Sequence, residues 1–194
     1  VTTIGVMAFD GCVNLTSVRL PDKLLFLGDS AFYNCVRLTS VHLPENLNVI
    51  GSGAFSGCEQ LVDVTFESLN NLSHLGSSPF KGTYWQNRQP DGFITLGPNL
   101  LDYKGDAPSN LVIPDGIRHI AEDTFLYGYE SVKTIKLPES LTNIGEAAFA
   151  GCKSLTTINL PDRLTTIGDD AFKGCDNLDD STKERIRQIN PQAF

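Results

Sequence analysis

The strongest constraint on the fold of this chain is an internal repeat of 23 residues that occurs in two separate stretches. In the first stretch three residue types recur at this spacing: Phe9, Phe32 and Phe55; Pro21 and Pro44; Cys12, Cys35 and Cys58. In the second stretch the same types recur at steps of 23 or 24: Phe125, Phe149 and Phe172; Pro114, Pro138 and Pro161; Cys152 and Cys175. Because three residue types share one period, we expect a stack of equivalent coils.

One unit follows the pattern L-x-x-[VI]-x-L-P-x-x-L-x-x-[IL]-G-x-x-[AT]-F-x-x-C, as in residues 38–58. Val41 and Leu43 alternate with polar residues, which predicts a short strand with both side chains in the core. Pro44 ends that strand because it has no N–H for the ladder. A lone unit cannot bury its apolar side, whereas stacked units can. The pattern therefore predicts a right-handed solenoid with short parallel strands, in the α/β class.

The joint Pro, Gly, Ala-Phe and Gly-Cys positions resemble the BspA-like leucine-rich-repeat family over residues 4–83 and 111–178. Ordinary leucine-rich repeats place an Asn after the strand instead. The resemblance implies a surface or secreted protein with a non-catalytic binding or adhesion role. It also implies an extracellular or cell-surface location and a host or matrix protein as partner.

We expect one leucine-rich-repeat domain over residues 1–178, interrupted by an insertion at 84–110. The insertion is either a β-hairpin around Gly97-Pro98-Asn99 or a degenerate coil in which Leu100 aligns with Leu24. The chain begins inside a unit, at the Ile-Gly position, which favours a fragment or a protein that has lost its leader.

Residues 179–194 switch to helical spacing and are predicted to cap the last coil. Ser181 and Glu184 form a predicted capping box at the start of this helix. Ile186 and Ile189 give it a thin apolar edge. Solenoid ends need a polar cap, so we interpret the segment as the closing element.

Composition argues against several classes of function. The 194 residues carry a formal net charge of −8 with no Lys/Arg cluster, which disfavours nucleic acid and anionic membrane surfaces as partners. No apolar run approaches the roughly 18–20 residues of a membrane span. The five Cys are at least 23 residues apart, so CxxC-type zinc or redox motifs are excluded and we expect a column of buried free thiols. No GxGxxG, Walker or HExxH motif is present, so we predict no enzyme, cofactor or metal.

The outward-facing strand positions are the candidate binding surface, since they vary while the core positions repeat. A merely solvated face would show the same variation. The candidates on this face are Arg19, His42, Asp63, Thr65, Lys136 and Asn159. The insertion adds the aromatic candidates Tyr84, Trp85 and Tyr103. The alternative for these aromatic residues is a small core of the insertion itself.

The sequence therefore predicts a non-catalytic protein-binding or adhesion module, with a structural spacer as the alternative. A carbohydrate-acting enzyme is a remote third hypothesis. Such an enzyme needs clustered carboxylates, and Asp63 is the only acidic residue among the outward-facing strand positions. His74 and His119 occupy equivalent positions in their coils, just before Leu75 and Ile120, and are expected to face solvent. Oligomeric state stays open, since an uncapped first coil could pair with the edge of another chain.

Overall fold

The structure is a computed structural model that describes residues 1–126 and 128–194. It confirms a β-solenoid built mostly from short parallel strands. The chain divides into two compact units, Val1–Pro90 and Asp91–Phe194, and each is described by itself.

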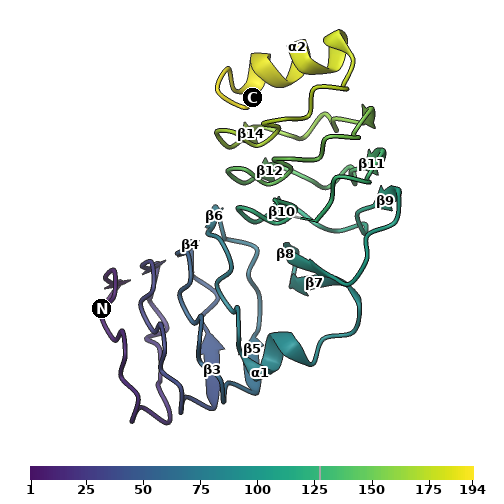
Figure 1. The fold of residues 1–194 in the computed structure, drawn as a ribbon. Coiled ribbons are helices and arrows are strands. Elements are labelled where there is room, and N and C mark those ends of the chain that lie inside the picture. The colour runs from purple at the N-terminus through teal and green to yellow at the C-terminus, as the bar shows by residue number, and fades with distance from the viewer. Residues whose placement is uncertain (127) are drawn as a thin grey trace. The chain divides into compact units, whose positions relative to one another are not determined.

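The first unit contains two columns of parallel strands (Figure 1). One column is a four-stranded sheet in the order β1 (Thr3–Ile4), β2 (Phe26–Leu27), β4 (Val49–Ile50) and β6 (His74–Leu75). The other column pairs β3 (Ser40–Leu43) with β5 (Asp63–Phe66) in parallel. Val41 pairs with Val64 here, so the predicted alternation of core and solvent positions along the strand is confirmed for β3. The short helix α1 (Tyr84–Asn87) ends the unit.

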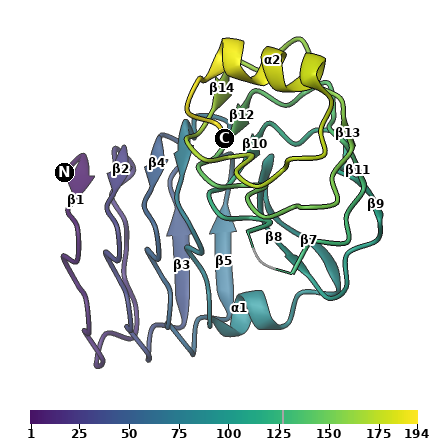
Figure 2. The ribbon, with the colours of Figure 1, turned by 45° about the horizontal axis from the view of Figure 1, so that its top comes forward.

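The second unit repeats this plan with a hairpin at its start (Figure 2). Its five-stranded sheet has the order β14 (Thr166–Ile167), β12 (Asn143–Ile144), β10 (His119–Ile120), β8 (Asn99–Lys104) and β7 (Gly92–Leu96). Its three-stranded sheet has the order β13 (Thr157–Ile158), β11 (Thr134–Lys136) and β9 (Asn110–Val112). Helix α2 (Asp180–Ile189) follows the last coil.

The insertion combines both of the alternatives that the sequence left open. Strands β7 and β8 form the predicted antiparallel hairpin, with a register shift between Ile94 and Thr95. At the same time β8 pairs in parallel with β10, so the second hairpin strand also serves as a rung of the solenoid. Leu100 of β8 pairs with Ile120 of β10. Ile120 lies in the second strand of its coil, as Leu27 does, so Leu100 is equivalent to Leu27 and not to Leu24.

Helix α2 confirms the predicted C-terminal cap, but its first turn is capped by a different residue. Asp179, not Ser181, is the N-cap, and its carboxylate accepts the backbone N–H of Thr182 at 2.9 Å. Hydrogen bonds from Ser181 and Thr182 hold the pKa of the Asp179 carboxyl well below its usual range. Ile186, within the helix, is fully buried.

A column of stacked phenylalanine rings forms the centre of each unit. Adjacent rings lie nearly parallel, as for Phe32 and Phe55, whose centroids are 5.3 Å apart with an interplanar angle of 2°. Trp85 ends the first column against Phe80, and Phe194 ends the second against Phe172. The prediction of a core column is confirmed except at Phe9 in the first coil, which is 39% exposed.

In several coils the glycine that follows the second strand is required because a neighbouring coil lies close to it, although Ala121 occupies this position after β10. A Cβ on Gly51 would lie 2.4 Å from the backbone nitrogen of Asp29 in the coil before it. The structural reason for a glycine at this position is the close approach of two backbones. Positive φ angles instead lie two residues on either side of the Phe, at Ser30 (52°) and Asn34 (54°).

The buried cysteines link successive coils through their thiols rather than through disulfides. The Cys58 thiol donates to the carbonyl of Phe32 at 3.1 Å, and the Cys175 thiol donates to that of Phe149 at 3.2 Å. Cys35 and Cys152 make the same contact, whereas Cys12 is exposed, and all five thiols are free. Burial raises the pKa of Cys58, Cys152 and Cys175 to about 12.

Replacing Phe55 by Ala is expected to lower the free energy of unfolding by about 3–5 kcal/mol, because it removes a fully buried ring between two others. Phe9→Ala is the matched control and should cost clearly less, since that ring has a neighbour on one side only. Chemical denaturation monitored by circular dichroism measures both values. Equal losses for the two variants would contradict a core column that is strongest at its centre.

The thiol column predicts one reactive cysteine in the folded protein. A raised pKa lowers the thiolate fraction at a given pH, and the thiolate is the reactive form. At pH 8, Ellman's reagent should therefore titrate only Cys12 in the native protein and all five thiols after unfolding in guanidinium. Rapid reaction of four or more thiols in the native state would show that the column is open to solvent.

Candidate functional site

The outward face of β3 and β5 brings three of the predicted binding residues together. His42, Asp63 and Thr65 are all exposed, and His42 lies opposite Thr65 in the parallel register. The His42 Nδ1 atom lies 3.0 Å from the Thr65 hydroxyl, so this contact stabilises the pairing of two surface side chains. Arg19, from the preceding coil, is also exposed but lies outside any strand.

The two predicted binding residues of the second unit, Lys136 and Asn159, differ in whether their side chains are exposed or hydrogen-bonded to a neighbouring coil. Lys136 is exposed at the end of β11, opposite Val112 of β9, which is 59% exposed. Asn159 instead extends the sheet: its Oδ1 accepts the Leu137 N–H at 2.7 Å and its Nδ2 donates to the Leu137 carbonyl at 2.9 Å. Both ends of the Asn159 amide therefore make ladder-like bonds to the neighbouring coil, which gives this side chain a structural role.

The aromatic candidates of the insertion are mostly engaged in packing. Trp85 is partly buried, its ring centroid lies 5.1 Å from that of Phe80, and its backbone N–H donates to Leu61 at 2.7 Å. Tyr103 packs edge-on against Phe93 at 5.0 Å. Only Tyr84, which is 54% exposed, is presented to solvent.

Histidine positions differ from the expectation at one place. His74 is exposed, as expected, but His119 is only 5% exposed. His119 pairs with Asn99 of β8, which is itself 1% exposed, and the equivalent Thr166 in β14 is exposed. The prediction was wrong at His119 because it took no account of the hairpin beside β10.

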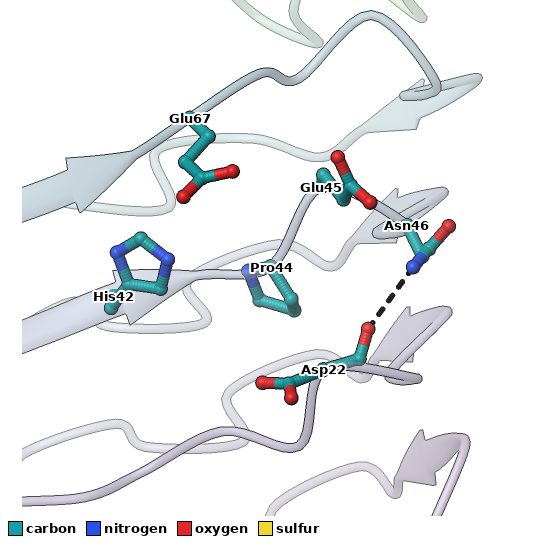
Figure 3. Close-up of a pocket in the computed structure, with 6 residues that line it drawn as sticks. All are labelled: Asp22, His42, Pro44, Glu45, Asn46 and Glu67. Carbon is teal, nitrogen blue, oxygen red and sulfur yellow. Dashed lines mark hydrogen bonds between the residues drawn. The ribbon is translucent and has the colours of Figure 1, made fainter.

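Sequence analysis missed an acidic hollow of about 350 Å³ on the first unit (Figure 3). Its lining comes from three successive coils: Asp22 from one, His42, Pro44, Glu45 and Asn46 from the next, and Glu67 from the third. The Asn46 amide donates to the Asp22 carbonyl at 3.1 Å, which ties two of these turns together. The sequence signal was an acid directly after the strand-ending Pro, at Asp22, Glu45, Asp115, Glu139 and Asp162.

A second hollow, of about 590 Å³, adjoins the first, because Asn46 lines both. Its apolar side is made by Leu25 and Phe26, which are 48% and 39% exposed, together with Val49. Thr3, Asn48 and Asn71 also line it, and the amide nitrogens of the two Asn donate to backbone carbonyls of neighbouring coils. The lining residues of the two hollows include three carboxylates and no Lys or Arg.

Across residues 1–126 and 128–194, no group of three His, Cys, Asp or Glu side chains is placed to hold a metal ion. In the same part of the chain, no helix combines the length and the apolarity needed to cross a membrane.

Solved structures with similar folds include three bacterial proteins. The leucine-rich-repeat protein of Treponema pallidum is 24% identical, with a TM-score of 0.43, over 97% of this chain and 87% of that one. A leucine-rich cell surface protein of Faecalibacterium prausnitzii is 23% identical, with a TM-score of 0.44, over 92% of this chain and 62% of that one. The pneumococcal vaccine antigen PcpA is 18% identical, with a TM-score of 0.39, over 92% of this chain and 66% of that one.

A search of curated proteins finds no match. The family described as BspA type leucine-rich repeat region matches residues 1–95 and 95–194, with six copies of the repeat. That match covers both repeat stretches and the insertion between them. The chain therefore belongs to the BspA-type leucine-rich-repeat family.

Proposed function

We propose that this chain is a non-catalytic protein-binding module that attaches a surface or secreted protein to a host or matrix protein. The observation that carries the proposal is the contrast between the two sides of each strand. In β3 and β5 the inward residues stay apolar, as Val41 and Val64 or Leu43 and Phe66, while the exposed outward residues change from Ser40 to Asp63 and from His42 to Thr65. Non-repeating exposed side chains on a repeating scaffold suit recognition of a specific partner.

The proposed mechanism is rigid display. The coils are joined by backbone hydrogen bonds and by stacked rings, so the outward side chains are held in place before any partner arrives. Preorganisation lowers the conformational entropy lost on binding. The face is polar and lacks a buried aromatic anchor, so affinity through it alone should be modest.

An extracellular or cell-surface location is part of this proposal and rests on membership of the family. A structural spacer within a larger surface protein is the second candidate function. Its support is that Asn159, Trp85 and Tyr103, three of the predicted binding residues, make internal contacts.

Attachment to a panel of purified extracellular-matrix proteins, measured by biolayer interferometry, tests the proposal. If the β3–β5 face binds, the double variant Asp63→Ala with Thr65→Ala should weaken attachment by about tenfold, which corresponds to about 1.4 kcal/mol. Lys136→Ala and Tyr84→Ala report in the same way on the second unit and on helix α1.

Lys153→Ala is the matched control for Lys136→Ala, because it also removes an exposed cation, but from a turn rather than from a strand face. It should leave attachment unchanged. No binding to any panel member would favour the spacer function, and equal losses in all variants would point to non-specific attraction.

A further inference from the structure

The apolar side chains at the second hollow are not required by the solenoid. Phe26, Val49 and His74 occupy one outward row, in which each residue pairs with the next along the sheet. The corresponding row in the second unit is Asn99, His119, Asn143 and Thr166, with no apolar member. A coil therefore folds equally well with a polar residue at this position.

The pair Leu25-Phe26 makes the contrast sharper. Its counterpart in the coil of β12 is Thr142-Asn143, and in the coil of β14 it is Thr165-Thr166. Leu25 and Phe26 are nevertheless 48% and 39% exposed. Contiguous exposed apolar side chains are typical of surfaces that bind a partner.

The charge next to this apolar patch indicates what kind of partner fits. Figure 3 shows Asp22 and Glu67 on either side of the strand that carries His42 and Pro44, with Glu45 beyond the Pro. These three carboxylates are exposed, and the lining residues of the two hollows include His42 but no Lys or Arg. A cationic side chain would therefore meet an excess of negative charge directly beside the apolar patch.

We propose that the two joined hollows bind a protein segment in which a Lys or Arg side chain lies next to a large apolar side chain. The cation occupies the acidic hollow and the apolar side chain covers Leu25, Phe26 and Val49. Asn46, shared by both hollows and bonded to Asp22, sets the spacing between the two contacts. This inference names a partner chemistry within the proposed protein-binding function and rests on it.

Fluorescence anisotropy with the labelled peptide Gly-Ser-Lys-Phe-Ser-Gly tests the inference on the whole chain. We expect a dissociation constant of about 0.1–1 mM at low salt, and an affinity at least about tenfold higher than for peptides with Glu in place of Lys or Ser in place of Phe. Raising the ionic strength should weaken binding, because the carboxylates are exposed.

Two variants address the two halves of the surface. Asp22→Asn with Glu45→Gln should lower the affinity at least about fivefold, whereas Asp115→Asn with Glu139→Gln, the same charge change in the second unit, should leave it within about twofold. Leu25→Thr with Phe26→Asn should abolish the preference for Phe over Ser. This second variant copies residues 142 and 143, which the solenoid already accommodates, so a folded protein is expected and is checked by its thermal melt.

Three results would overturn the inference: no preference for the Lys-Phe peptide, retention of that preference in both variants of the first unit, or an equal loss in the second-unit control. None of them decides the proposed function, because attachment is also tested at Asp63 and Lys136, which line neither hollow, whereas Thr65 contacts the lining residue His42. Failure of the inference and failure of the proposed function are therefore separate outcomes.

Discussion

The close stacking of one coil on the next is the constraint from which the rest of the structure follows. Backbone groups of successive coils bond directly, as in the 2.8 Å contacts from Phe32 N–H to the Ala54 carbonyl and from Gly51 N–H to the Leu27 carbonyl. This proximity leaves no room for a Cβ at Gly51 and brings equivalent rings such as Phe32 and Phe55 to 5.3 Å. Positions that face a neighbouring coil are therefore fixed in type, and outward positions are not.

Because stacked contacts repeat, the sequence could predict the features that depend on them. The period alone predicted the strand at Val41 and Leu43, the ring column at Phe55 and the thiol column at Cys58, and all four side chains are buried. Features that arise once escaped this reasoning. Trp85 ends a ring column and Asn159 replaces backbone groups in a ladder, and neither role is visible without knowing which residue lies in the next coil.

The candidate site likewise contains residues that a repeating pattern predicts and residues that it does not. Alternation along a strand was enough to place His42, Asp63 and Thr65 on a solvent-facing surface. The acidic hollow could not be located in that way, since its walls are turn residues of three coils whose separation depends on the stacking. The recurrence of an acid after Pro was the available signal, but recurrence alone cannot show which acids border a hollow and which stand alone in solvent.

Freedom at the outward positions explains how one fold can carry different surfaces along its length. The strand position occupied by Phe26 in one coil is occupied by Val49, Asn143 or Thr166 in other coils, and each of these residues pairs with the neighbouring strand in the same way. A substitution there changes what the surface contacts without changing how the coils stack. A surface feature of such a protein is therefore formed by a few neighbouring coils, and the acidic and apolar hollows of the first unit, whose lining residues lie between Thr3 and Asn71, have that extent.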